Sequence, residues 1–277
     1  MLGQRRMFAK RSMSSNHHKP KQPQPARPER LLPKANAKIR VNILYDDGHV
    51  LALDKPIGLP TQPGRGHIAD TLVNAAFATH GEALCKLGAD RDWGLLHRLD
   101  MDVGGVVLMG LTEIGYDNVR AQFEDRTIAK KYLAIAHNAP PADTGRCTRA
   151  LTEVIRGDMK VSVNLPRGGE DAQTRWKVLS KSKTHCLLEV EPLTGRLHQI
   201  RAHLAMVGCP IVGERVYRPD LPPNTSRAPA GRAMDPLLLQ AWEIEFRCVA
   251  GTMQRVRSKL GIDMLQFATQ QRWQIPV

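Results

Sequence analysis

The 277-residue chain has no hydrophobic run long enough to span a membrane, few aromatic residues and no paired cysteine motif. A spanning helix needs about 18 or more apolar residues in a row, so we expect no membrane association. The five cysteines are scattered, without a Cys-x-x-Cys pair, which argues against a disulfide framework or a zinc ribbon. With 42% hydrophobic and 5% aromatic residues, the composition is typical of a globular protein in a reducing compartment.

Acidic residues are absent from the first 28 positions. This segment is rich in arginine and serine, and no apolar secretory core follows it, a composition typical of organelle transit peptides. We therefore expect a protein of the mitochondrial matrix. A disordered basic arm that contacts RNA phosphates is the alternative, and the two interpretations are compatible. Residues 16–40 carry five prolines among polar and basic residues, which predicts a linker and makes residues 1–40 disordered as a whole.

The net charge of +13 belongs mostly to this tail. Residues 1–40 hold 11 of the 40 Lys and Arg residues and a single acid, whereas residues 41–277 carry a net charge of only +3. The charge of the body alone therefore does not indicate a nucleic-acid binder. Its 237 residues are enough for one large core, and we expect one domain over 41–277.

Alternating hydrophobicity after Val41 predicts many short strands and few helices. Strands are expected at 43–45, 50–54, 105–109, 131–136, 173–179, 186–190 and 242–246. Helices are expected at 70–79, after a cap at Thr112, and around 200–207, while residues 218–236 are expected to form a surface loop. This mixture indicates an α+β fold with a mainly antiparallel sheet.

Three polar segments stand where an ordinary core would be apolar: His97-Arg98-Leu99-Asp100, Lys130-Lys131-Tyr132 and residues 194–203. Taken singly, Asp100 is a turn carboxylate, Tyr132 a core tyrosine, and Arg196 and Arg201 a solvated helix face. His198 and His203 lack a third ligand at metal spacing, so no metal site is expected. The three segments together indicate a functional site.

In this order the segments resemble the RluA-type family of RNA pseudouridine synthases, over nearly all of 41–277. The resemblance includes the opening loop Lys55-Pro56-Ile57-Gly58-Leu59-Pro60, the His97–Asp100 motif followed by Gly105, and Lys130–Ala134. It also includes 194–203 and Gly208–Tyr217, which agree almost residue for residue.

The resemblance implies the pseudouridine-synthase fold, a mixed and mainly antiparallel sheet with flanking helices and a central catalytic cleft. It implies isomerisation of uridine in RNA, with no cofactor and no metal. Asp100 is then the essential carboxylate, and Arg196 is the cation that keeps it ionised in a dry pocket. Tyr132 packs on the base and takes its C5 proton, since stacking on an aromatic ring suits any base.

The resemblance also implies RNA contacts for Arg98, Lys130, His198 and Arg201. Arg98 is expected to help hold the RNA with its target base flipped out, and Arg201 to hold a phosphate with the N-terminal turn of its helix. Flipping costs least for an unpaired base, so loops and bulges are the expected targets.

The sequence departs from the family pattern at three points. Asp102-Val103-Gly104-Gly105 stands where the family has Thr-Ser-Gly, so two hydroxyls that brace the catalytic loop are missing. Gln240 replaces a common histidine. No S4-type RNA-binding domain precedes the body, so target recognition is expected from the domain itself, the basic tail or partner proteins.

The leading hypothesis is a pseudouridine synthase acting on mitochondrial large-subunit ribosomal RNA, with a role in rRNA processing and ribosome biogenesis. The alternative is an RNA-binding assembly factor of the mitochondrial ribosome that uses the fold without catalysis and works with other ribosome-assembly proteins. Val103-Gly104 and the modest charge of the body motivate this alternative. A generic basic nucleic-acid binder explains the tail and leaves the three motifs unexplained.

Overall fold

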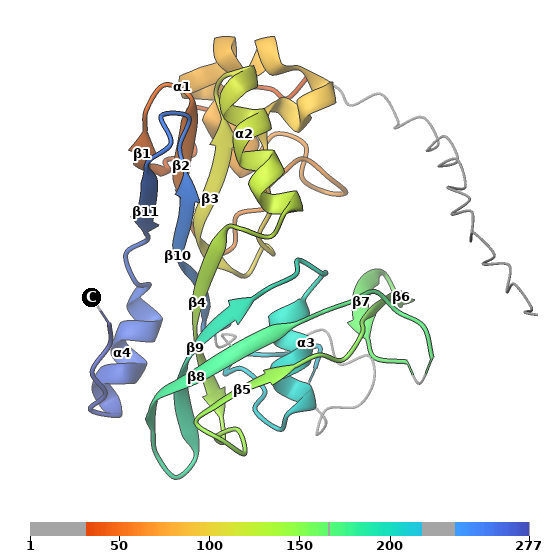
Figure 1. Ribbon diagram of the computed structural model, residues 1–277, viewed down its shortest axis with the longest axis vertical. Coiled ribbons are helices and arrows are strands. Elements are labelled where there is room, and N and C mark those ends of the chain that lie inside the picture. The colour runs from red at the N-terminus through yellow and green to blue at the C-terminus, as the bar shows by residue number, and fades with distance from the viewer. Residues whose placement is uncertain (1–31, 166, 218–235, 277) are drawn as a thin grey trace, which may run out of the picture. The chain divides into compact units, whose positions relative to one another are not determined.

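The framework of the molecule is a nine-stranded sheet in the order β1-β2-β3-β10-β4-β9-β8-β5, with β11 paired to β10 (Figure 1). The computed structural model describes residues 32–165, 167–217 and 236–276. The strands are β1 (Asn42–Asp46), β2 (Val50–Lys55), β3 (Gly104–Gly110), β4 (Ala129–His137), β5 (Thr144–Cys147), β8 (Thr174–Lys181), β9 (His185–Pro192), β10 (Leu239–Arg247) and β11 (Met253–Arg257). Adjacent strands are antiparallel except β3 and β10. The predicted α+β class with a mainly antiparallel sheet is confirmed.

In the described part of the chain, the remaining elements are a hairpin, four α-helices and a short 3₁₀ helix. The hairpin consists of β6 (Thr152–Arg156) and β7 (Met159–Val163), which pair only with each other. The helices are α1 (Leu72–Leu87), η1 (Ala89–Gly94), α2 (Glu113–Glu124), α3 (Gln199–Met206) and α4 (Ile262–Gln270). Within the described ranges, no helix is long and apolar enough to cross a membrane.

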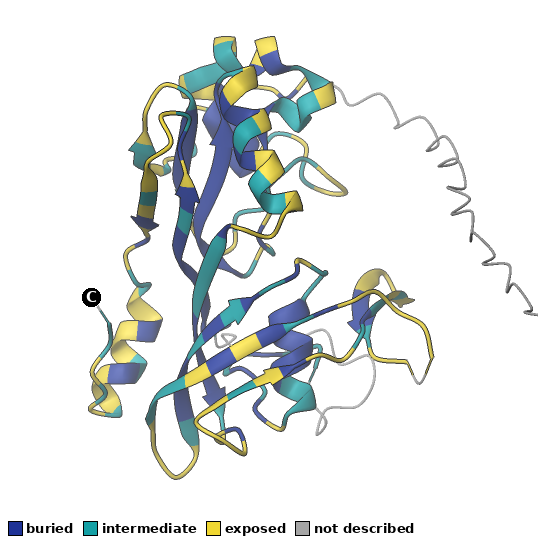
Figure 2. Ribbon diagram, in the orientation of Figure 1, coloured by how far each residue is buried: buried dark blue, intermediate teal, exposed yellow. Residues whose placement is uncertain are grey.

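Both faces of the sheet are covered, and the alternation in β4 shows why. Ala134 and Ala136 point into the larger core, which includes residues of α1, α2 and α3. Leu133 and Ile135 point to the other face, where Met264 of α4 packs against them. The strands β2, β3 and β10 are accordingly buried along most of their length (Figure 2). The alternation of side chains along β4 thus places successive residues in two separate hydrophobic cores.

Most predicted elements are present with shifted ends. α1 begins two residues later than expected because Thr71 caps it, accepting a hydrogen bond from the backbone N–H of Asn74. It also continues to Leu87, through a kink at His80. The cap predicted at Thr112 is confirmed by its bond from Gly115 N–H at 3.2 Å. The strands β5, β6, β7 and β11 and the helix α4 were not predicted. The predicted loop at 218–236 lies almost wholly outside the described residues.

The folded unit begins at Leu32, nine residues before the predicted boundary at residue 41. Asn36 donates from its backbone N–H to the Asn74 carbonyl at 2.9 Å and from its side chain to Ala69 O at 2.7 Å. The side chain of Asn74 donates in turn to Lys34 O at 2.7 Å. These bonds attach residues 32–40, which composition assigned to the linker, to the start of α1.

Candidate active site

The seven residues assigned to the site from sequence line one cavity of about 490 Å³. They are Arg98, Asp100, Lys130, Tyr132, Arg196, His198 and Arg201. They come from the loop before β3, from β4, and from the end of the loop before α3 together with the first turn of that helix. The structure therefore brings the three polar segments together at one cleft.

The backbone on either side of Asp100 is clamped by two side chains from the 55–61 loop. The hydroxyl of Thr61 donates to Leu99 O at 2.7 Å and accepts from Leu99 N–H at 3.1 Å. On the other side, the ammonium group of Lys55 donates to Met101 O at 3.1 Å. A loop held on both flanks presents its carboxylate in a fixed position, as pre-organised catalysis requires.

Val103 and Gly104, which stand where the family has Thr-Ser, pack tightly in the turn after Asp100. Val103 is buried, and its N–H closes the turn by donating to Asp100 O at 3.1 Å. A Cβ atom at Gly104 would lie 3.0 Å from Ile57 and 3.1 Å from the carbonyl oxygen of Lys55. The 55–61 loop packs so closely here that it leaves little room for the family's serine. In this chain the backbone beside Asp100 is held by Thr61 and Lys55.

The next glycine allows two strands to meet under the site. Gly105 has φ of +119°, and a Cβ atom there would collide with the carbonyl oxygen of Ala241. Gly105 is paired with Ala241 in the parallel contact of β3 with β10. Only glycine combines this dihedral angle with this close approach.

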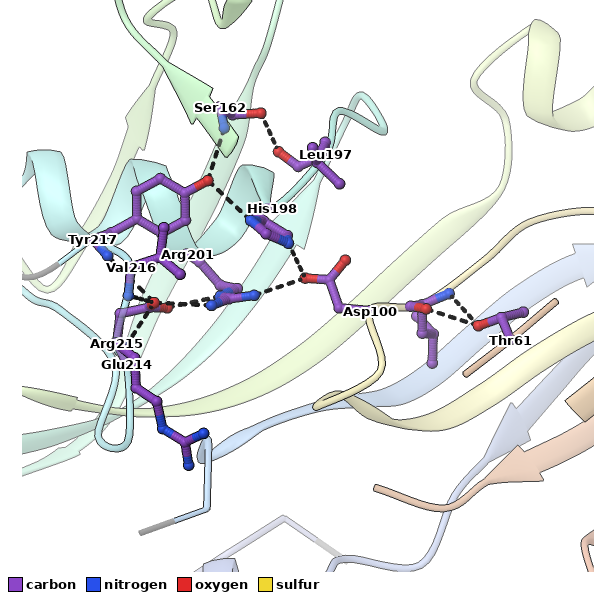
Figure 3. A network of polar contacts seen from close by, with 11 residues as sticks. Thr61, Asp100, Ser162, Leu197, His198, Arg201, Glu214, Arg215, Val216 and Tyr217 are labelled. Carbon is purple, nitrogen blue, oxygen red and sulfur yellow. Dashed lines mark hydrogen bonds and ion pairs between the residues drawn. The ribbon is translucent and has the colours of Figure 1, made fainter. Parts of the chain in front are cut away.

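The cation that pairs with the Asp100 carboxylate is Arg201, and the predicted pairing with Arg196 is wrong. Arg201 Nη1 lies 3.3 Å from Asp100 Oδ2, and His198 Nε2 lies 3.7 Å from the same oxygen (Figure 3). The guanidinium of Arg196 instead forms an ion pair with Glu170 and donates to Asp171 O at 3.0 Å. Arg196 still lines the cleft, but it does not charge-balance Asp100.

Arg201 is itself held by a buried second carboxylate, that of Glu214. Its Nε and Nη2 donate to the two Glu214 oxygens at 2.7 and 2.9 Å. Burial raises the pKa of Glu214, but the hydrogen bonds and charge of Arg201 outweigh it and bring that pKa below its usual value. Arg201 is only 5% exposed. Three hydrogen bonds of its guanidinium go to two carboxylates, which gives Arg201 a charge-balancing position, and the expected contact with an RNA phosphate stays a prediction.

Glu214 is fixed by the backbone as well as by Arg201. Its Oε1 accepts the N–H groups of the next three residues at 2.9, 2.7 and 3.3 Å, as Figure 3 shows in part; these residues are Arg215, Val216 and Tyr217. A carboxylate that accepts several backbone N–H bonds is stabilised in its ionised form. The chain Glu214–Arg201–Asp100 thus joins the 208–217 segment to the catalytic loop through α3.

Tyr132 faces the same cavity from β4. Burial, and then the negative charge of Asp100, raises the pKa of its hydroxyl well above the usual value. Tyr132 therefore stays protonated at neutral pH and presents an uncharged ring beside the carboxylate. This suits the predicted packing against a flat, neutral base.

The two remaining predicted contacts differ in their surroundings. Arg98 is exposed at the rim. Burial lowers the pKa of Lys130, with Glu191 opposing that effect, and its ammonium group lies 6.0 Å from the centre of the Phe123 ring. The catalytic and RNA-binding roles assigned from sequence to the seven residues of the cleft remain predictions.

Sequence reasoning assigned no role to Lys55, Thr61 or Glu214. All three are polar residues at most 4% exposed. In the sequence, these residues are marked only by lying in, or directly beside, the segments 55–60 and 208–217 that resemble the family. The His97 ring of the motif is likewise structural, because its Nε2 accepts the Leu108 N–H at 3.0 Å, and burial lowers its pKa to about 3.

Gln240 also has a defined task where the family commonly has histidine. Its amide nitrogen donates to Ser258 Oγ at 2.7 Å and to Lys259 O at 2.6 Å, and its oxygen accepts the Gly261 N–H at 2.9 Å. Gly261 is the residue that precedes α4. The substitution therefore fastens the start of α4 to β10 and lies outside the cleft lining.

The buried position of the Lys55 ammonium group should make the free energy of unfolding depend on pH. Its Nζ donates to three carbonyls, those of Pro56, Leu59 and Met101, at 3.0, 2.6 and 3.1 Å. Three acceptors match the three donors of an ammonium group. Burial lowers the pKa of Lys55 to about 8, although Asp100 and Asp102 act to raise it.

Between pH 8 and about 10.5 the unfolded chain then holds a proton on Lys55 that the folded chain has lost, so stability from this group rises with pH. We expect urea unfolding to show the wild type gaining about 3 kcal/mol over Lys55→Met across this range, and no change in the difference from pH 6 to 7. Comparison with Lys55→Met cancels the titration of other groups. A difference that stays flat up to pH 10.5 would contradict the assignment.

Three comparisons place the chain among known proteins. A sequence model of the family "RNA pseudouridylate synthase" matches residues 49–206. An uncharacterized RNA pseudouridine synthase of Synechocystis is 34% identical over 180 residues, which cover 65% of this chain and 55% of that protein. The ribosomal large subunit pseudouridine synthase D of Xanthomonas campestris is 35% identical over 179 residues, covering 65% and 52%. The matches thus span a little over half the length of these curated relatives.

The fold has a solved counterpart. The structure of human RNA pseudouridylate synthase domain containing 4 superposes with a TM-score of 0.65 at 23% identity, over 85% of this chain and 94% of that one. This likeness supports the fold. The family match covers more than half of the residues and includes the Asp100 loop, β4 and α3. The chain therefore belongs to the RNA pseudouridylate synthase family.

Proposed function

We propose that the chain is an RNA pseudouridine synthase that isomerises uridine to pseudouridine, with Asp100 as its catalytic carboxylate. The observation that carries this proposal is the Asp100–Arg201 ion pair at 3.3 Å in a cleft shared with Tyr132. A carboxylate with a committed cation and a rigid backbone is costly to maintain and has no evident structural use here, since Arg201 is already satisfied by Glu214.

The reaction breaks the N1–C1′ bond of uridine, turns the uracil, and forms a C5–C1′ bond with loss of the C5 proton. Asp100 either attacks the sugar or removes a sugar proton, and Arg201 supplies the counter-charge beside its carboxylate. Tyr132 keeps the freed base stacked in the cleft. The C5 proton is released to water, because the phenol of Tyr132 is already protonated and cannot accept it. The protein supplies positioning and charge, and no redox step is involved.

The proposed substrate is ribosomal RNA of the large subunit, in mitochondria. Relatives that carry the name ribosomal large subunit pseudouridine synthase D support the RNA class. The acid-free, arginine-rich and serine-rich composition of residues 1–28 supports the organelle. Ribosome-assembly proteins are the proposed partners in cells.

The test uses the full chain and large-subunit ribosomal RNA transcribed with uridine tritiated at C5. Because the isomerisation releases the C5 hydrogen to water, we expect tritium release, together with carbodiimide-dependent stops of reverse transcription at one or a few discrete positions. Mitochondrial transcripts are compared with bacterial and cytosolic ones. Absence of release from every RNA tested would contradict the proposed activity, and release confined to non-mitochondrial RNA would contradict the proposed substrate.

A further inference from the structure

His198 has an unusual backbone and two polar neighbours. It precedes α3 with φ of 50° and ψ of 23°, in the left-handed region, and its side chain makes no capping bond to the helix. A non-glycine residue held in this region without a capping role costs free energy, and such strain often accompanies function. Its ring bridges Tyr217 and Asp100: Nδ1 lies 3.0 Å from the Tyr217 hydroxyl oxygen, and Nε2 lies 3.7 Å from Asp100 Oδ2.

The chain of donors behind His198 determines which ring nitrogen carries the proton. The N–H of Ser162 in β7 donates to the Tyr217 hydroxyl oxygen at 2.9 Å (Figure 3). A backbone N–H only donates, so the Tyr217 oxygen is the acceptor there. The Tyr217 proton then has one partner among the described residues, Nδ1 of His198. If Nδ1 carried the proton instead, the Tyr217 hydroxyl would have no acceptor, a loss that burial makes expensive.

The protonation states agree with this direction. Burial raises the pKa of Tyr217 to about 12, so the phenol keeps the proton that it donates. Burial also lowers the pKa of His198, an effect larger than that of Asp100, which acts to raise it. A neutral His198 that accepts at Nδ1 carries its single proton on Nε2, the nitrogen that faces Asp100.

We propose that His198 is a positioning residue for the Asp100 carboxylate, locked by Tyr217 in the tautomer that directs its Nε2 proton at Asp100 Oδ2. This inference rests on the proposed function of Asp100. Arg201 balances the charge, and His198 orients the carboxylate from a second direction. At 3.7 Å the contact is longer than a hydrogen bond, and catalytic contacts of this kind commonly shorten when substrate fills the site.

The arrangement also connects the β6–β7 hairpin to the reacting centre. Ser162 is 1% exposed, and its hydroxyl donates to Leu197 O, the residue before His198. The N–H and hydroxyl of this single residue thus fix both the Tyr217 oxygen and the backbone at the start of α3. If RNA binding shifts the β6–β7 hairpin, the shift would reach Asp100 through the contacts of Tyr217 and His198.

The first test is ¹⁵N NMR of histidine-labelled full chain without RNA, with the His198 signals identified by their loss in His198→Gly. We expect the Nε2–H tautomer in the wild type and a mixture of both tautomers in Tyr217→Phe, which keeps the ring and removes the donor. An Nδ1–H tautomer in the wild type would overturn the inference. This measurement needs no activity, so its outcome stays distinct from failure of the proposed function.

The second test is kinetic and uses the strained backbone. Glycine accepts the left-handed conformation without strain, so His198→Gly should keep the unfolding midpoint within about 3 °C of the wild type. Its kcat should fall about 10²-fold, the cost of a carboxylate that is no longer well positioned. His198→Gln offers an amide donor at a similar reach and should recover part of the loss. Unchanged kcat in His198→Gly, or no difference between the glycine and glutamine variants, would refute the positioning role.

Discussion

Asp100→Asn is expected to lower pseudouridine formation by about 10³-fold while the protein stays folded. An amide is neither a base nor a nucleophile of useful strength, so it supports neither role proposed for the carboxylate. The fold should tolerate the change because the two side chains have nearly the same shape. Arg201 also keeps both of its bonds to Glu214. Single-turnover tritium release measures the activity, and circular dichroism with urea unfolding measures the fold.

The matched control is Asp102→Asn. It makes the same change of charge and shape two residues along the same loop, and Asp102 does not line the cleft. We expect this variant to keep most of the activity. Equal losses in the two variants would mean that the charge of the loop matters and that Asp100 has no special part in the chemistry.

The Asp100→Asn variant also distinguishes the proposed enzyme from the alternative role in ribosome assembly. If catalysis is the cellular role, cells that express only Asp100→Asn should lose the modified positions and share the ribosome defect of cells without the protein. If the protein instead acts by binding RNA without catalysis, cells that express only Asp100→Asn should lose the pseudouridines but assemble ribosomes normally. The expected result for a synthase whose product is needed is the first of these.

The choice between Arg196 and Arg201 could not be made from the sequence. Arg196 lies just before α3 and Arg201 lies in its first turn, and which one faces Asp100 depends on where the helix begins. The residue that ends the loop is His198, in a left-handed conformation without a side-chain cap, and sequence rules look for Ser, Thr, Asp or Asn at that place. Arg196 therefore stays on the loop, within reach of Glu170, while Arg201 enters the buried face of α3.

The sequence predicted elements well where hydrophobic alternation or a cap was strong, as in β4 and at Thr112. It missed α4, whose N-terminus has no side-chain cap, and the β6–β7 hairpin, whose strands are short and bury only Val161 and Ser162. Lys55 was missed for another reason. A lysine at the end of a strand is normally solvated, and only the tertiary fold brings the carbonyls of Pro56, Leu59 and Met101 around it.

Removal of Arg201 should have the largest effect on stability. Arg201→Met leaves the Glu214 side chain, which is fully buried, without its counter-charge. Breaking a buried pair on one side typically costs about 3–5 kcal/mol, because a lone charge stays in a medium that solvates it poorly. We expect a loss of this size in urea unfolding at pH 7, reduced by the backbone N–H bonds that Glu214 keeps.

The double variant Arg201→Met/Glu214→Gln tests this explanation. A neutral amide oxygen still accepts the backbone N–H groups, and no charge remains buried, so the double variant should be more stable than Arg201→Met alone by about 2 kcal/mol. Acidification should reduce the difference in stability between the single and the double variant, because protonation of Glu214 in Arg201→Met removes the same buried charge. Strictly additive losses would show that Arg201 stabilises the fold by packing alone.

Activity should not follow stability in this series. Asp100 loses its cation in both variants, so both should remain strongly impaired in tritium release even where the double variant regains its fold. Arg201→Lys keeps one positive charge but cannot donate to Glu214 and Asp100 in the same fork-like geometry, and its activity should lie between those of the wild type and Arg201→Met. Recovery of activity together with stability in the double variant would mean that Asp100 needs a rigid loop and no counter-charge. A persistent loss would assign Arg201 two separable tasks, one toward Glu214 in the fold and one toward Asp100 in the reaction.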